Sequence, residues 1–150
     1  KVRPDIWVRN NAVSRSRTVN KEWNWERYHD DPSLNVTNEK VEIGKAIFES
    51  LSDAITEREL PLVDKFNKGY VAFKRGNRNI CGVDVYWRAT PRLWVKLPAP
   101  PEELDVQMPY QELRQVWDRH NSEIGWQIPS IAEIPDCGPL LDLAAKFNEL

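Results

Sequence analysis

The sequence predicts an α+β domain in which a helix is followed by an antiparallel meander of three or more strands and then by a C-terminal helix. Helical periodicity occurs at 38–59 and again after residue 139, whereas the apolar residues in between recur at every second position. Period two is typical of strands, and strands grouped between helices indicate the α+β class. With 150 residues, of which 41% are hydrophobic, the chain is long enough for one core. We therefore predict an N-terminal arm over 1–37 and one domain over 38–150.

The predicted arm combines Pro, Asn and Arg residues with three aromatic residues, Trp23, Trp25 and Tyr28. A short helix is expected near 20–29. Three large rings within six residues are unusual for a free tail, so we expect the arm to dock through them. The chain has seven Trp, and composition alone does not distinguish a core role from a binding role.

The first predicted helix of the domain runs from Asn38 to about Glu59. Its apolar residues recur at helical spacing, and Glu39 in the first turn opposes the helix dipole. Asn38 is expected to be the N-cap, and Pro61 is expected to end the helix. The residues on the apolar side are Ile43, Ile47, Leu51, Ala54 and Ile55.

Three strands are predicted at Tyr70–Lys74, Ile80–Trp87 and Arg92–Leu97, because these segments are rich in β-branched and aromatic residues and are separated by turn sequences. Alternation assigns their residues to two faces. The predicted core face, which packs against the first helix, holds Val71, Phe73, Cys81, Val83, Val85, Trp87, Leu93, Val95 and Leu97. The opposite face holds Tyr70, Lys74, Gly82, Asp84, Tyr86, Arg92, Trp94 and Lys96.

Beyond Pro98, the sequence predicts three short elements. Apolar residues at helical spacing predict a helix over Tyr110–Arg119, and Gly125–Ser130 is expected to form an edge strand. Pro139 is placed as in the first turn of a helix, with Asp136 as the expected cap.

The charges are segregated along the chain, although the net charge is only −2. Residues 65–96 contain eight Lys and Arg and a single acid, Asp84, whereas 31–64 and 101–150 are acidic. A basic block is typical of a surface that binds an anionic partner. The alternative is that the basic and acidic segments attract one another within the fold.

The basic block and the aromatic residues coincide on the second face of the predicted sheet. Aromatic rings stack on nucleobases, and cationic side chains bind phosphates, so this mixture suits nucleic acid or another anionic partner. The alternative is that the N-terminal Trp pair or the C-terminal helix covers this face. The predicted binding residues are Tyr70, Lys74, Tyr86, Arg92, Trp94 and Lys96.

Catalytic and metal-binding motifs are absent from the sequence. The six glycines have neither P-loop nor dinucleotide-binding spacing, and no nucleophile elbow occurs. Cys81, Cys137, His29 and His120 lack the paired spacing of zinc ligands, so we expect no metal and no cofactor. Cys137 precedes the last predicted helix, where the helix N-terminus would lower its pKa, but an apolar packing role is favoured.

One arrangement is similar to that of metal-dependent nucleases, which place an Asp on one strand and an acid-x-Lys triplet on the next. Asp84 and Lys96 fit the outer positions. The middle position is Trp94, so a metal ion would lose its second carboxylate. The sequence therefore predicts at most a degenerate site of this kind.

Three segments resemble a bacterial C-terminal domain of unknown function: Phe66–Arg75, Cys81–Val85 and Pro91–Pro98. That domain is similar to the module in proteins labelled "predicted transport protein" and also follows nuclease and DNA-restriction domains. Trp117, Gly125–Pro129 and Ile134–Asp136 resemble its closing part. The resemblance covers about residues 40–150 and implies an α+β accessory domain associated with restriction or defence. It implies no active site.

These observations favour a non-enzymatic accessory or recognition domain of a larger bacterial protein, binding nucleic acid or another anionic partner. The alternative is a structural protein-interaction or dimerisation domain that tethers a catalytic partner, using the Trp-rich arm or the acidic C-terminal surface. An enzyme built around Asp84 ranks last. The sequence lacks a signal peptide and a membrane-spanning segment, so we expect a cytoplasmic fragment of a longer chain without a membrane partner.

Overall fold

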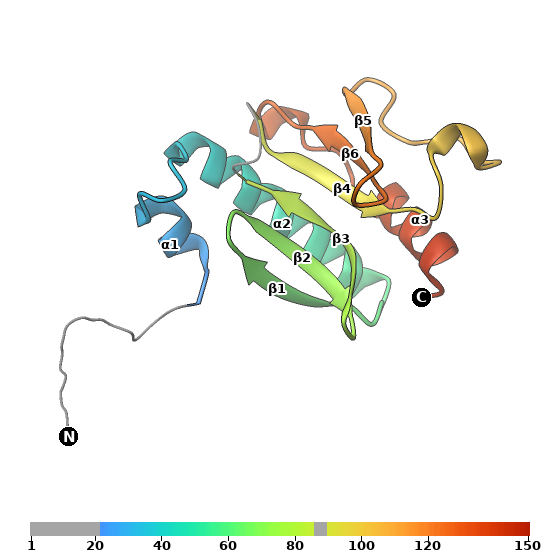
Figure 1. Cartoon of the computed structure of the whole chain (residues 1–150), viewed down its shortest axis with the longest axis horizontal. Helices are drawn as coiled ribbons and strands as arrows, with labels where there is room; N and C mark the ends of the chain where they lie inside the picture. Colours follow the sequence, from blue (N-terminus) through green and yellow to red (C-terminus); the bar gives the residue numbers. More distant parts are fainter. Residues whose placement is uncertain (1–21, 86–89) are drawn as a thin grey trace.

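The computed structural model describes residues 22–85 and 90–150, and it confirms the predicted α+β class (Figure 1). Six antiparallel strands form one sheet in the order β1-β2-β3-β4-β6-β5. None of the helices in these two ranges is both long enough and apolar enough to cross a membrane. The helices are α1 (Trp25–Asp30), α2 (Asn38–Glu57) and α3 (Gly138–Asn148), and the strands are β1 (Val63–Asn67), β2 (Tyr70–Arg75), β3 (Arg78–Asp84), β4 (Arg92–Lys96), β5 (Gln115–Asp118) and β6 (Glu123–Gln127).

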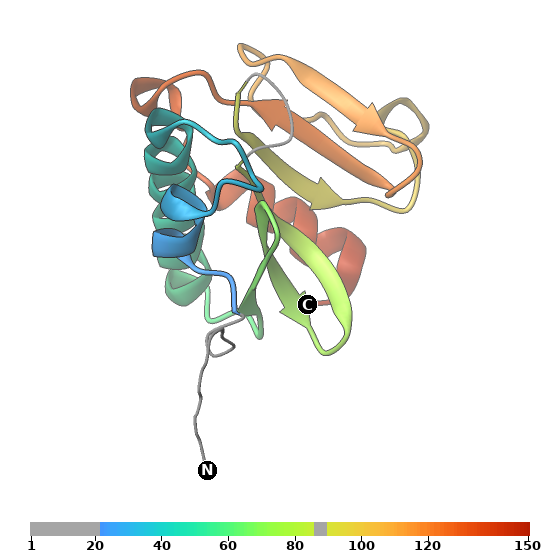
Figure 2. The same ribbon diagram turned by 60° about the vertical axis from the view of Figure 1, so that its left-hand side comes forward.

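Helices α2 and α3 pack against the same face of the sheet and against each other (Figures 1 and 2). The strand residues predicted for the core face are buried there, apart from Trp87, which lies outside the described residues. Helix α2 contacts β3, and a Cβ at Gly44 would lie 3.0 Å from a methyl group of Val85, the residue that follows this strand. In the described part of the chain, the cluster of buried hydrophobic residues therefore lies on the helix side of the sheet.

The ends of α2 differ slightly from the prediction. Thr37, not Asn38, is the N-cap: its backbone is extended, and its hydroxyl accepts a hydrogen bond from the amide of Lys40. The helix ends at Glu57, before Pro61, and Glu59 adopts a left-handed conformation with φ of 53°. A change of backbone direction thus terminates the helix before proline is reached.

The predicted short helix at 110–119 is wrong. Tyr110 has a φ of 60°, which interrupts a right-handed helix, and β5 then pairs with β6. The segment predicted as an edge strand, Gly125–Ser130, corresponds to β6, which starts at Glu123 and lies inside the sheet between β4 and β5. Strand β1 was not predicted. Pairing with neighbouring strands, which is non-local, decides these three segments.

Helix α3 starts at Gly138, and Cys137 rather than Asp136 occupies the N-cap position. The carboxylate of Asp136 accepts a hydrogen bond from the amide of Gly138. Burial raises the pKa of the Cys137 thiol to about 11, opposed by a hydrogen bond from Ser50. Cys137 therefore has the packing role favoured by the sequence, without the lowered pKa of a thiol activated by a helix N-terminus.

The described part of the arm packs on the domain. The Trp25 ring lies edge-on to Tyr28, Phe48 and Phe66, with centroids 5.4 to 5.6 Å apart. Tyr28 is buried, and its hydroxyl lies within hydrogen-bond distance of two backbone carbonyls of β1 and β2. Trp23 stacks on Tyr28 at 5.8 Å. These rings join α1 to α2 and to the edge of the sheet.

Candidate functional site

On the face of the sheet opposite the helices, small residues lie on both sides of Trp94. In the strand register, Ala72 lies beside Gly82, Gly82 beside Trp94, and Trp94 beside Gly125. A Cβ at Gly82 would lie 2.7 Å from the Trp94 ring and 2.2 Å from a carbonyl oxygen of β2. Glycine is therefore required at position 82, and Trp94 lies flat on the sheet with only 2% of its surface exposed.

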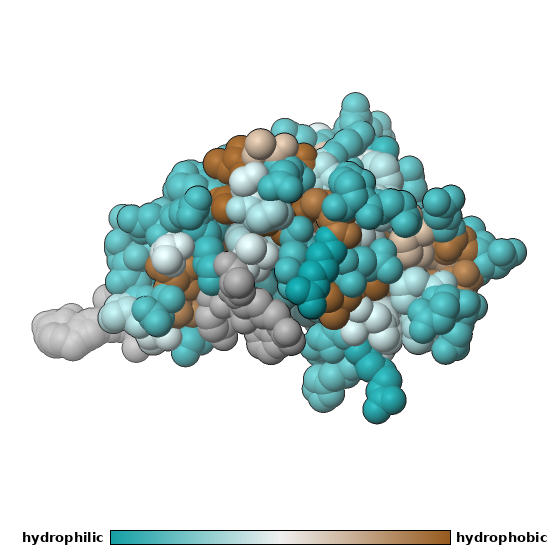
Figure 3. All heavy atoms as spheres, turned by 90° about the horizontal axis from the view of Figure 1, so that it is seen from above, coloured by the Kyte–Doolittle hydropathy of each residue, from teal (hydrophilic) through white to brown (hydrophobic). Residues whose placement is uncertain are grey.

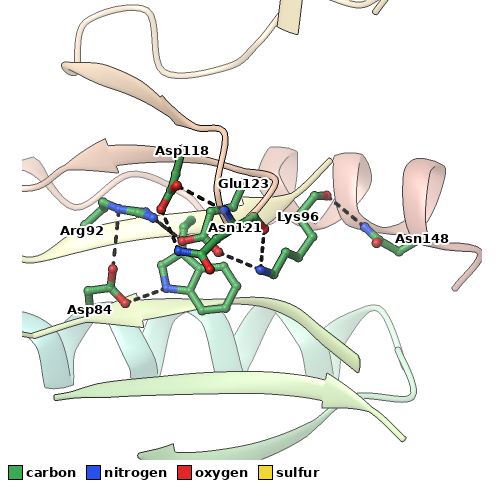
Figure 4. A network of polar contacts seen from close by, with 8 residues as sticks. Asp84, Arg92, Lys96, Asp118, Asn121, Glu123 and Asn148 are labelled. Carbon is green, nitrogen blue, oxygen red and sulfur yellow. Dashed lines mark hydrogen bonds and ion pairs between the residues drawn. The ribbon is translucent and has the colours of Figure 1, made fainter. Parts of the chain in front are cut away.

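Arg92 is the centre of a buried ionic network on this face (Figure 4). Its side chain lies over Gly125, where a Cβ would be 2.7 Å from a guanidinium nitrogen. The guanidinium binds the Glu123 carboxylate through both terminal nitrogens and lies 3.5 Å from the Asp84 carboxylate. Arg92 and Glu123 are 7% and 6% exposed. Burying charges is costly unless they are paired, and such networks add little net stability, so a role beyond stability is favoured.

Lys96 extends the network toward the β5–β6 turn. Its ammonium group lies 3.0 Å from the second Glu123 oxygen and donates to the carbonyl of Asn121 at 2.6 Å. The ammonium is also 5.6 Å from the centroid of the Trp94 ring, within the range of a cation–π interaction. Asp118 in turn accepts hydrogen bonds from Asn121, so the turn is held in place.

Asp84 is the least well compensated member of the network. One of its oxygens accepts a hydrogen bond of 3.0 Å from the Trp94 indole, and among the described residues the other has only the longer contact to Arg92. Burial raises the pKa of Asp84 to about 7; Arg92 and the Trp94 hydrogen bond lower it, whereas Glu123 raises it further. A carboxyl group that changes charge near neutral pH is frequent at functional sites.

These groups line a pocket of about 240 Å³ on the open face. Three of the lining side chains, those of Lys68, Tyr70 and Asn79, form no hydrogen bond or ion pair within the described ranges 22–85 and 90–150. They are available to a ligand. The lining residues are Lys68, Gly69, Tyr70, Asn79, Asp84, Arg92, Trp94, Lys96, Asp118, Asn121 and Glu123.

Four of the six predicted binding residues, Tyr70, Arg92, Trp94 and Lys96, line this pocket. Lys74 lies on β2 outside it, and Tyr86 falls outside the described residues. The burial of Trp94 contradicts the expected use of its ring as an exposed stacking surface. The expected alternative is also wrong for the described chain: neither the Trp23–Trp25 pair nor helix α3 covers this face.

The sequence prediction missed Glu123, Asp118 and Asn121, together with Lys68 and Asn79. A signal for Glu123 was present, because Glu123, Gly125 and Gln127 alternate with the apolar residues of β6. The predicted strand begins at Gly125 and therefore excludes Glu123. Asp118 and Asn121 belong to the segment predicted as helix or directly follow it, so no sequence signal placed them beside Lys96.

The nuclease-like arrangement of Asp84 and Lys96 is only partly present. Trp94 supplies no carboxylate, but Glu123 on the neighbouring strand lies beside Lys96. The guanidinium of Arg92 contacts both Asp84 and Glu123 and occupies the position between them. Among the described residues, no group of three acidic, His or Cys side chains is arranged to hold a metal ion.

In comparisons of this chain with known proteins, no family model matches it, and no curated protein or solved structure matches it either.

Proposed function

We propose that this domain is a non-enzymatic recognition domain that binds an anionic ligand, nucleic acid or another oxyanion-bearing partner, in the pocket on the open face of the sheet. The observation that supports this most directly is a set of polar side chains that line the pocket and have no side-chain partner within the described residues, those of Lys68, Tyr70 and Asn79. Polar groups that converge on a concave site are typical of ligand binding.

The shape of the site favours insertion of one group over stacking along a flat surface. Trp94 forms the floor of the pocket and is covered, so it positions Asp84 and Lys96 instead of contacting bases. Two ammonium groups line the pocket: that of Lys68, which is exposed, and that of Lys96, which is already paired with Glu123 and Asn121. A single anionic group entering the pocket that these two lysines line fits the arrangement best.

Fluorescence anisotropy with a labelled single-stranded oligonucleotide, together with a titration with inorganic sulfate, tests the proposal. Lys68→Glu is expected to weaken oligonucleotide binding at least about tenfold and to reduce its salt dependence, because a phosphate contact is lost. Lys45→Glu, an exposed position on α2, is the matched control and should change little. Absence of binding to both probes, or equal effects of the two variants, would refute the proposal.

The second candidate function is protein interaction through the Trp-rich arm, and the same measurements can distinguish it from anion binding. Trp23 and Trp25 make intramolecular contacts with Arg27, Tyr28, Phe48 and Phe66, which does not favour their use as a free docking surface. On the face shown in Figure 3, hydrophobic residues form separate patches within a largely hydrophilic surface. Concentration-dependent self-association without anion binding would favour this role.

A further inference from the structure

The charges around Asp84 balance only when its carboxyl group is ionised. Three cations and three carboxylates line the pocket, and they come from the β1–β2 turn, β3, β4, β5 and β6. Within the described residues, the titratable and charged groups that line the pocket together with Asp84 are Tyr70 on β2, Arg92 and Lys96 on β4, Asp118 on β5, Glu123 on β6 and Lys68 in the β1–β2 turn. Protonation of Asp84 therefore leaves a net charge of plus one, calculated from these six charged side chains.

The geometry indicates which carboxylate takes up that proton. Glu123 is held by Arg92 and Lys96, and Asp118 is held by the side chain and backbone of Asn121. Within residues 22–85 and 90–150, the side chain of Asp84 has one hydrogen bond and one contact of 3.5 Å. Once the carboxylate of Asp84 is protonated, its hydroxyl can donate a hydrogen bond to a ligand oxygen in the pocket.

We propose that the pocket binds an oxyanion together with one proton, which Asp84 takes up from solvent as the anion enters the pocket that Lys68 and Lys96 line. This inference rests on the proposed function and specifies its ligand chemistry and its regulation. No bond in the ligand is made or broken: a solvent proton moves to a carboxylate oxygen of Asp84, and the hydroxyl donates to the anion. Neutralising Asp84 removes the repulsion between its carboxylate and the ligand, so binding weakens as the pH rises.

The test measures affinity at about pH 6 and about pH 8 with two probes whose own charge is constant in that range. Inorganic sulfate represents a free oxyanion, and an oligothymidine without terminal phosphate represents a nucleic-acid backbone. Because Asp84 has a pKa of about 7 in the free protein, affinity is expected to fall about tenfold between the two pH values. If sulfate binds, a small oxyanion is sufficient as a ligand. If only the oligonucleotide binds, the ligand is the phosphate backbone of a nucleic acid.

Variants identify the group that titrates. Asp84→Asn is expected to bind with the same affinity at both pH values, because its side chain cannot ionise. Asp53→Asn, at an exposed position on α2, should keep the wild-type pH dependence. His120→Gln is a second control, because His120 lies in the β5–β6 turn, close to Asp118 and Asn121 of the pocket. Loss of the pH dependence in His120→Gln would contradict the assignment to Asp84.

Calorimetry on the wild-type protein gives a test that does not depend on whether a variant folds. Titrations in buffers with different ionisation enthalpies measure the number of protons taken up on binding, and above neutral pH we expect a value close to one. Binding of equal affinity at both pH values, without proton uptake, would refute this inference and leave the proposed function intact. No binding at either pH would refute the proposed function itself.

Discussion

Replacing Asp84 with Asn should change how the stability of the protein depends on pH. The amide keeps the shape of the side chain and can still accept the hydrogen bond from Trp94, but it does not ionise. In the folded protein the pKa of Asp84 is raised from 3.8 to about 7, mainly by burial. The folded state therefore binds this proton more tightly than the unfolded state, and wild-type stability should fall as the pH rises from about 4 to about 7.

The size of the effect follows from the shift of the pKa. A change from 3.8 to about 7 corresponds to about 4 kcal/mol above neutral pH, since one unit is worth about 1.4 kcal/mol. Between about pH 5 and about pH 8, the wild type should lose about 2 to 3 kcal/mol relative to Asp84→Asn. The difference between the two proteins cancels the contributions of other groups that titrate in this range.

Urea unfolding followed by Trp fluorescence at both pH values measures this difference, with Asp53→Asn as the control. The free energy of unfolding of Asp84→Asn should rise relative to the wild type as the pH is raised, whereas that of Asp53→Asn should follow the wild type. If the difference between Asp84→Asn and the wild type is the same at both pH values, the carboxyl group of Asp84 does not have a raised pKa and the reasoning fails.

Four further substitutions test the network and the packing. Glu123→Gln should destabilise the domain by about 3 kcal/mol, because it removes a buried partner charge. It should also lower the pKa of Asp84, since Glu123 raises that pKa. An unchanged pKa of Asp84 in a carboxyl NMR titration would contradict the coupling between the two carboxyl groups. Gly82→Ala should lower the free energy of unfolding by about 1 to 3 kcal/mol, because the added methyl group overpacks the sheet face. Gly44→Ala should change it by less than about 1 kcal/mol, because the higher helix propensity of Ala offsets the tighter contact with Val85. Equal losses in denaturant unfolding would be inconsistent with the close approach of Trp94 and β2 to Gly82. Tyr28→Phe removes the hydroxyl that binds carbonyls of β1 and β2 and should lower the free energy of unfolding by about 1 kcal/mol, which the same urea titration detects.

The parts of the fold predicted correctly are those whose periodicity is local and long. The twenty-residue α2 and the two faces of β2, β3 and β4 follow from the spacing of apolar residues. The segment after Tyr110 failed because its apolar residues fit a helix equally well, and pairing with β6 decided the outcome. Strand β1 has an exposed or half-exposed pattern, so it lacks the alternation that would have identified it.

The sequence pattern predicted the sheet face on which the candidate pocket lies, but not the ion pairs within it. Alternation placed Arg92, Trp94 and Lys96 on one face, and that placement is correct. The prediction of exposed rings and free cations failed for Arg92 and Trp94, because Glu123 comes from a strand that sequence pattern did not place beside β4. The carboxylate of Glu123, which balances the charge of Arg92, is close to it in space but distant from it in sequence.

The sequence by itself determined the class of the fold, the core face of the sheet and the face on which Asp84 stands, because side-chain direction in strands and helices is fixed by a local period. The tertiary structure alone decided that β6 lies next to β4, that Gly82 and Gly125 leave room for Trp94 and Arg92, and that Asp84 is buried beside Glu123. These features depend on which strands become neighbours, and the interaction of charges depends on their distance and burial, which no local pattern encodes.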